Sequence, residues 1–99
     1  MKEESSFTDV LNEYVKRSVY RPSQLARLTG LPPMTIVNWL NGRVQQPRHW
    51  QDVVRMGKVP RLSLVEMDSL LQAAGFPCVV QLGRFADGPA EQEVLAFWA

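Results

Sequence analysis

The side chains with the clearest chemical potential in this chain are the cations of its central segment. Residues 16–61 carry nine lysines and arginines against Asp52 alone, which is a net charge of +8. Residues 1–15 carry a net −3 and residues 62–99 a net −4, so the whole chain is only +1. A basic segment between acidic ends favours a surface that binds a polyanion such as nucleic acid. Arginines that merely solvate helix faces would give the same pattern, so charge alone leaves both interpretations open.

The residues that could support catalysis or hold a metal ion are few. His49 and Cys78 are the single histidine and the single cysteine, and neither has a second ligand or a base at a suitable spacing. Glu91 and Glu93 are two positions apart, so on a helix their side chains do not face each other. The sequence therefore predicts no enzyme activity, no metal site, no cofactor and no disulfide.

Apolar periodicity predicts that short helices position these side chains. Between Phe7 and Val15 the apolar residues recur at i, i+3, i+4, i+7 and i+8, which is one face of a helix, and Ser6 is the expected N-cap. Similar patterns, together with the positions of proline and glycine, predict four further helices. The expected helices cover about residues 7–18, 22–29, 33–41, 48–58 and 64–74.

Local signals mark several of the expected helix ends. Gly30 and Gly75 each follow a helix and can take the left-handed conformation that closes it. Ser63 and Glu66 have the spacing of a capping box, in which each side chain bonds the other residue's backbone amide. These signals predict sharp boundaries for the second and fifth helices.

Residues 78–99 differ in pattern from the rest of the chain. Residues 78–82 form a β-prone run with no evident partner strand, and residues 90–98 have the pattern of a last short helix. The segment holds apolar side chains that are candidates for a two-fold contact between protomers. These side chains are Val79, Val80, Leu82, Val94, Leu95, Phe97 and Trp98. The alternatives are that the segment folds back over its own helices or serves as a linker.

Residues 21–43 have the pattern of a helix-turn-helix motif. Two short helices are joined by a tight turn that contains Gly30, within a series of short helices. Leu25 and Ala26 are expected to pack on Ile36, and Trp39 is expected to lie partly in the core. This packing leaves the outer face of the second helix free to enter the major groove of DNA.

The sequence here resembles the Cro/repressor-type (XRE-like) helix-turn-helix family over roughly residues 7–77. The matching positions are Leu25-Ala26, Gly30, Thr35-Ile36, Asn38-Trp39-Leu40, Asn41-Gly42-Arg43 and Pro47-Arg48-His49-Trp50. The resemblance implies an all-α fold, with a five-helix lambda-repressor-like helix-turn-helix domain over residues 1–77 and a short C-terminal extension over residues 78–99. It also implies a small bacterial or phage transcriptional regulator that binds double-stranded DNA sequence-specifically and forms a homodimer, for which the apolar residues of the extension are the candidate contact.

The resemblance further implies which residues meet DNA. In this family the second helix of the motif, here about residues 33–41, is the recognition helix. The positions that reach bases are here Pro32, Pro33, Met34 and Asn38. The positions that meet phosphates, or lie where the family often contacts them, are here Arg21, Thr35, Asn41, Arg43 and Arg48.

The chain departs from the family in its groove-facing residues. Pro32, Pro33 and Met34 cannot make bidentate hydrogen bonds to base edges. Direct readout therefore rests largely on Asn38, whose amide suits adenine. Met34 and Val37 could meet thymine methyl groups, or they could form an apolar surface that binds another protein.

Three functions therefore stay open at this point. The first is DNA binding by a transcriptional regulator, the second is a protein-interaction module that kept the fold, and the third is the N-terminal DNA-binding domain of a longer regulator. The basic central segment favours the first over the second. No apolar run is long enough to span a bilayer and residues 1–6 do not form a secretory signal, so we expect a soluble, cytoplasmic protein with no membrane partner.

Overall fold

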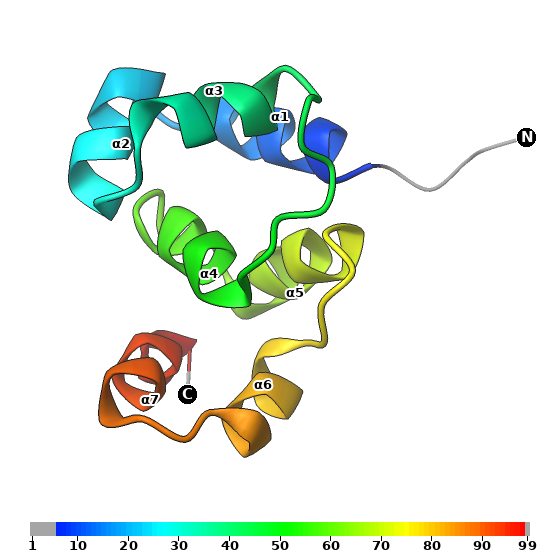
Figure 1. Ribbon diagram of the computed structural model, residues 1–99, viewed down its shortest axis with the longest axis vertical. Helices are drawn as coiled ribbons and strands as arrows, with labels where there is room; N and C mark the ends of the chain where they lie inside the picture. The colour runs from blue at the N-terminus through cyan, green and yellow to red at the C-terminus, as the bar shows by residue number, and fades with distance from the viewer. Residues whose placement is uncertain (1–5, 99) are drawn as a thin grey trace, which may run out of the picture.

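Three layers of helices are stacked along the longest dimension of the molecule (Figure 1). The upper layer holds α1 (Phe7–Arg17), α2 (Pro22–Thr29) and α3 (Pro33–Leu40), and the middle layer holds α4 (Trp50–Lys58) and α5 (Leu64–Ala73). The lower layer holds α6 (Val79–Phe85) and α7 (Pro89–Leu95), which continues into a 3-10 helix, η1 (Ala96–Trp98).

The computed structural model describes residues 6–98, and all regular structure in this range is helical. Residues 1–5 and residue 99 lie outside the described residues, and the expectation that residues 1–6 form no secretory signal falls mostly on them. The all-α class is confirmed, and the five helices expected before residue 78 all form, each starting within two residues of its predicted position. In the described part of the chain, no helix has the length and apolarity that crossing a membrane requires.

The predicted side-chain caps start α1 and α5. Ser6 Oγ accepts a hydrogen bond from the Asp9 amide at 3.2 Å. Ser63 Oγ accepts from the Glu66 amide at 3.2 Å, and the Glu66 carboxylate accepts from the Ser63 amide at 2.9 Å. The caps satisfy amide groups that have no acceptor within the first turn of a helix, so these two starts follow from local sequence.

The predicted end of α5 also forms. Gly75 has a φ of 89°. Its amide donates to the Gln72 carbonyl at 3.0 Å, and the Phe76 amide donates to the Leu71 carbonyl at 2.8 Å. This pair of bonds is the Schellman motif, in which glycine takes the left-handed position at no steric cost.

The middle layer is the centre of the core. Its most buried side chains, each at most 1% exposed, are Val53, Val54, Met56, Met67, Leu70 and Leu71. Gly57 allows α4 and α5 to approach closely, because a Cβ atom there would collide with Met67 Sδ. Helices of the upper layer contact α4 and α5 on one side and helices of the lower layer on the other.

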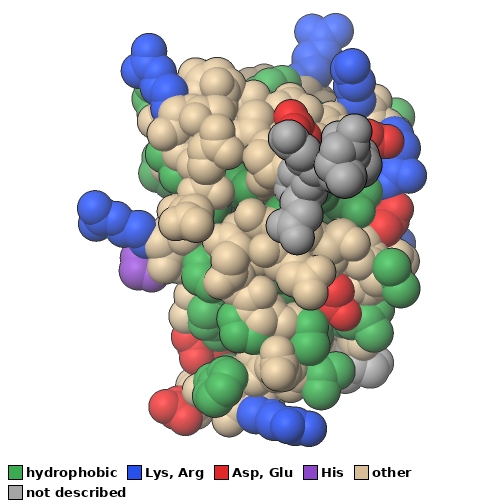
Figure 2. All heavy atoms as spheres, turned by 90° about the vertical axis from the view of Figure 1, so that its right-hand side faces the viewer, with side chains coloured by type: hydrophobic (Ala, Val, Ile, Leu, Met, Phe, Trp, Pro, Cys, Tyr) green, Lys and Arg blue, Asp and Glu red, His purple; other side chains and the backbone are tan. Residues whose placement is uncertain are grey.

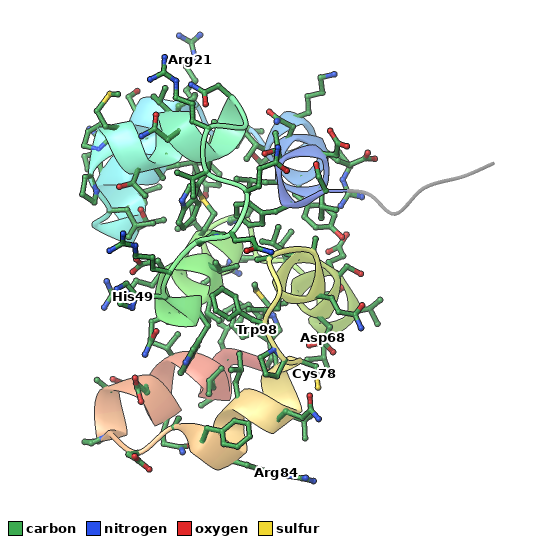
Figure 3. All side chains as sticks on the ribbon, turned by 45° about the vertical axis from the view of Figure 1, so that its right-hand side comes forward. Arg21, His49, Asp68, Cys78, Arg84 and Trp98 are labelled. Carbon is green, nitrogen blue, oxygen red and sulfur yellow. The ribbon has the colours of Figure 1, made fainter. Side chains whose placement is uncertain are left out.

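The prediction of a β-prone run over residues 78–82 is wrong, because this segment leads into α6. The Val79 amide donates to Asp68 Oδ1 at 2.9 Å, so a carboxylate from α5 caps the first turn of α6. Figure 3 shows Asp68 close to Cys78 at this junction. Val79 and Leu82 lie one turn apart and are buried. Since the described residues contain no strand to pair with, a helix is the conformation that satisfies the backbone of this segment.

The end of the chain returns to the middle layer. Trp98 Nε1 donates to the Leu62 carbonyl at 2.8 Å, and Leu95 is 5% exposed. Because α7 contacts α4 and α6 contacts α5, the C-terminal segment folds back over its own helices.

This packing uses part of the apolar surface that was proposed for a two-fold contact. The members of that set buried within the chain are Val79, Leu82 and Leu95. Val80 and Phe97 remain exposed, at 58% and 43%. Pairing of two protomers stays a prediction, and the residues available for it are fewer than the sequence suggests.

Candidate nucleic-acid interface

The helices α2 and α3 form a tightly joined pair at the top of the molecule (Figure 1). Leu25, Ala26 and Ile36 belong to one buried cluster, as predicted. Gly30 makes the turn with a φ of 78°, and its amide donates to the Ala26 carbonyl at 3.0 Å. Thr29 Oγ1 donates to the Leu25 carbonyl at 2.6 Å, so its buried hydroxyl is satisfied. The angle between the two helices is therefore set by a packed core and a closed turn.

Helix α1 holds the C-terminal end of α3. Thr8 Oγ1 donates to the Trp39 carbonyl at 3.3 Å, and Asn12 Nδ2 donates to the Leu40 carbonyl at 2.9 Å. The Phe7 ring packs edge-on against Trp39 at 5.5 Å between centroids. These contacts satisfy carbonyls that a helix end leaves without partners, so α3 cannot rotate freely on its support.

The sequence interpretation missed Thr8 and Asn12 as positioning residues. Their spacing of four places them on the same side of α1, beside the apolar stripe, and that signal was available. What the spacing could not reveal is the helix that they contact, because that contact spans about thirty residues of chain.

The outer face of α3 is apolar and exposed. Met34 is 61% exposed and Val37 is 41% exposed, whereas Ile36 and Trp39 on the inner face are at most 3% exposed. Pro33 at the first helical position is exposed, and Thr35 is half-buried. The face therefore offers methyl and methylene groups and few hydrogen-bond donors to a ligand.

Asn38 is the one amide side chain on this helix, and it is half-buried. Its Oδ1 is buried and has no hydrogen-bond partner. Its backbone carbonyl accepts from the Val44 amide at 3.2 Å, which ties the loop after α3 to the helix. A bidentate contact with adenine needs the carboxamide oxygen and nitrogen together, so Oδ1 has to turn outward before Asn38 can make one.

The loop after α3 displays two arginines. Asn41 Oδ1 accepts from the Arg43 amide at 3.0 Å, and Gly42 has a φ of 87°, so the chain turns sharply here. Arg43 and Arg48 are both exposed, while Pro47 between them is buried. The buried proline and the asparagine turn leave both guanidinium groups pointing away from the core.

Of the nine predicted DNA contacts, seven lie on α3 and the loop that follows it. They are Pro33, Met34, Thr35, Asn38, Asn41, Arg43 and Arg48. Of the other two, Pro32 is exposed and directly precedes α3, and Arg21 directly precedes α2 and points outward at the top of the molecule (Figure 3). His49 points outward at the side, next to α4 (Figure 3). Most of the predicted contacts therefore lie close together because they are neighbours along the chain.

Most cations of the central segment are exposed and without a carboxylate partner. Among the described residues the one ion pair joins Arg17 to Glu66, at 2.6 Å between Nη2 and Oε2. The Ser63 amide, and next the Arg17 guanidinium, hold the pKa of Glu66 below its usual value, and Glu66 raises the pKa of Arg17. The exposed cations outside this pair, on or beside α2, α3 and α4, are Arg21, Arg27, Arg43, Arg48, Arg55, Lys58 and Arg61. Their charge is therefore available to an external anion.

The residues considered for catalysis are dispersed. His49 is exposed at the start of α4, and Glu91 on α7 accepts a hydrogen bond from Gln51. Over residues 6–98 there is no cluster of three histidine, cysteine or acidic side chains that could hold a metal ion.

Comparison of the chain with known protein families, with curated proteins and with solved structures gives no match.

Proposed function

We propose that the protein is a small helix-turn-helix regulator of the lambda-repressor-like type that binds double-stranded DNA. In this proposal α2 and α3 are the motif, and α3 is the recognition helix. The observation that carries it is the contrast across α3: its inner face is anchored by α1 and α2, and its outer face is exposed beside unpaired arginines. A rigid, exposed helix next to positive charge suits the width and the potential of the major groove.

The residues divide by role. Arg43 and Arg48 neutralise phosphates and supply affinity that depends on salt. Met34 and Val37 contact thymine methyl groups, and Asn38 reads adenine after its carboxamide turns outward. That rotation is inexpensive because Oδ1 has no hydrogen bond to break. The protein acts without catalysis, by occluding or recruiting at a promoter.

The proposal includes a homodimer. One recognition helix with a single amide side chain discriminates poorly, and two protomers on half-sites one helical turn apart would roughly square the selectivity. Val80 and Phe97 are the members of the predicted contact set that stay exposed for pairing. Sedimentation of the full chain at micromolar concentration tests this part separately from DNA binding.

The deciding experiment is selection of bound sequences from a random duplex pool near physiological salt. We expect enrichment of a palindrome with A·T pairs in each half-site, and affinity for the selected duplex that falls steeply as salt rises. Enrichment of a single, non-palindromic half-site supports DNA binding and contradicts the homodimer. If no sequence is enriched, and the affinity for duplex DNA does not fall as salt rises, DNA binding is contradicted altogether.

A second function, binding of another protein through α3, is favoured by one observation. Met34 and Val37 form an exposed apolar patch that follows two prolines, and such a surface suits a protein partner as well as a thymine methyl. The same selection distinguishes the two, because a protein-binding surface gives no preferred DNA sequence.

A further inference from the structure

An open cavity of about 520 Å³ lies between the upper, middle and lower layers. It is lined from α2, α4, α7 and η1 and from residues next to α2 and α4. Its volume falls within the range of small-molecule sites. Its apolar walls are made by Tyr20, Leu28, Val59, Val94 and Phe97. The cavity lies away from α3, which contributes no lining residue.

Three cations share this cavity with the apolar walls. Arg55 and Lys58 are three residues apart and therefore on one face of α4, and Arg61 follows the helix. Lys58 Nζ lies 5.7 Å from the centroid of the Phe97 ring. The lining includes no carboxylate, and none of the three cations is in an ion pair within residues 6–98. Like charges gathered without a counter-ion repel one another, so an anion that enters the cavity is stabilised.

The backbone at Arg61 adds a further observation on the residues that line the cavity. Helix α4 ends with the same bonds as α5: the Leu62 amide donates to the Gly57 carbonyl and the Arg61 amide to the Lys58 carbonyl, both at 3.1 Å. The left-handed position, held by glycine in α5, is held here by Arg61 with a φ of 58°. An L-residue with a Cβ is disfavoured in this conformation relative to glycine, so Arg61 stands beside the cavity at a cost in stability.

We propose that this cavity binds a small amphiphilic carboxylate. The apolar body of the ligand lies against Leu28, Val94 and Phe97, and its carboxylate meets the cations of α4 and Arg61. A duplex phosphate backbone fits less well, because it has no apolar body to cover the walls. The inference does not depend on DNA binding, since it uses neither α3 nor the loop after it.

Decanoate is the probe, with decanol and decyltrimethylammonium as matched ligands of the same chain length. Thermal unfolding and the methyl NMR signals of Leu28, Val59 and Val94 report binding. We expect decanoate to raise Tm and shift these signals, with affinity about tenfold above that of decanol, because charge-assisted bonds form with the carboxylate alone. Decyltrimethylammonium should bind least. Equal binding of decanoate and decanol overturns the proposal.

Two variants and one control sharpen the test. Lys58→Gln should weaken decanoate binding about tenfold, and Arg61→Gly should weaken it about fivefold. Arg61→Gly should also raise the Tm of the free protein, because it releases the backbone strain, so unfolding cannot explain its loss of binding. Arg84→Gln, which removes an exposed cation of α6 away from the cavity, should leave binding unchanged.

Unchanged decanoate binding in both variants contradicts the assignment. So does a shift of the Val94 signals by duplex DNA with none by decanoate, because the cations would then belong to a nucleic-acid surface.

Discussion

The pair α2–α3 and the pair α6–α7 occupy opposite ends of the molecule and are held in comparable ways (Figure 1). Each is a pair of short helices in which a side chain donates a hydrogen bond to a carbonyl at a helix end, from outside the pair in the first case and from within it in the second. Asn12 of α1 bonds the Leu40 carbonyl at the end of α3. Gln92 of α7 bonds the Ala86 carbonyl after α6 at 2.7 Å. In both pairs a side-chain hydrogen bond therefore satisfies a carbonyl that the helix end leaves without a partner.

The two pairs differ in the charge that surrounds their exposed apolar residues. Met34 and Val37 project from α3, next to the exposed arginines, and Val80 and Phe85 project from α6, in a segment with net negative charge. On the face shown in Figure 2, lysine and arginine side chains stand out mainly around the upper part and hydrophobic side chains gather over the lower part. An exposed apolar patch alone does not identify a partner, and the neighbouring positive charge favours a polyanion at the first patch and not at the second.

The prediction with the largest expected effect tests whether the two ends of the molecule unfold together in one transition. Leu82→Ala in α6 and Ile36→Ala in α3 each remove a side chain that is at most 2% exposed. Each should lower the free energy of unfolding by about 2–5 kcal/mol, through lost burial and the cavity left behind. Urea titration followed by circular dichroism should show one transition at a lower midpoint with an unchanged slope. Two transitions in Leu82→Ala, the second at the wild-type midpoint, would mean that the lower layer folds separately.

The next effect concerns base readout at the upper end. Asn38→Ala should cost about 1–3 kcal/mol of binding at one A·T pair and little at other positions. Thermal stability should stay equal or rise, because the substitution removes a buried oxygen that has no partner. Binding to a panel of single-base operator variants measures the first effect and thermal unfolding the second. If Asn38→Ala keeps the preference for adenine, that preference comes from DNA shape and not from a contact of Asn38.

A prediction with a smaller effect compares how much the cations at the two ends of the molecule contribute to DNA affinity. Arg43→Ala and Arg48→Ala should each weaken binding to all sequences about tenfold and lower the salt dependence by about one unit of slope. Arg84→Ala on α6, which points outward at the bottom of the molecule (Figure 3), should change neither. Affinity measured as a function of salt separates the three variants. A loss confined to one base pair, or an equal loss in Arg84→Ala, would contradict the phosphate assignment.

The smallest effect concerns the ion pair that joins the upper layer to the middle layer. The pKa of Glu66 is lowered in the folded state by the Ser63 amide and by Arg17, so its charge adds stability above the usual value of 4.5 and that stability is lost as pH falls through the lower folded value. At neutral pH, Glu66→Gln should cost at most about 0.5 kcal/mol, since the pair is largely solvent-exposed.

The difference between Glu66→Gln and the wild type should vanish well below pH 4.5. Urea unfolding at several pH values measures it, and glutamine keeps the capping geometry as an internal control. A difference that persists in acid would mean that packing, and not charge, carries the effect.

Much of the fold was accessible from sequence because its signals act within one helical turn. Ser6, Ser63 and Glu66 start helices through bonds to amides three residues away, and Gly30 and Gly75 end them through backbone conformation. The all-α class and the boundaries of five helices followed from these local rules. Most of the predicted DNA contacts also fall together, because they are neighbours along α3 and its loop.

The failures share a different physical cause. Residues 78–82 have β-prone side chains, and the cap that starts α6 comes from Asp68 in another helix. The exposure of Val80 and the burial of Leu82 follow from packing on α5 and not from their hydrophobicity, which is similar. Local preference predicts a conformation only where no distant group outweighs it.

Sequence alone specified the five helices before residue 78, the uneven charge and the candidate nucleic-acid contacts, since each depends on neighbours within a turn or on residue composition. Tertiary structure decided which of those residues contact one another. It brought Thr8 and Asn12 under the end of α3 and turned Asn38 Oδ1 inward. It also placed Arg61 in the left-handed conformation after α4 and brought three cations together around an apolar cavity. These features join segments tens of residues apart, and their energies come from packing that no local pattern encodes.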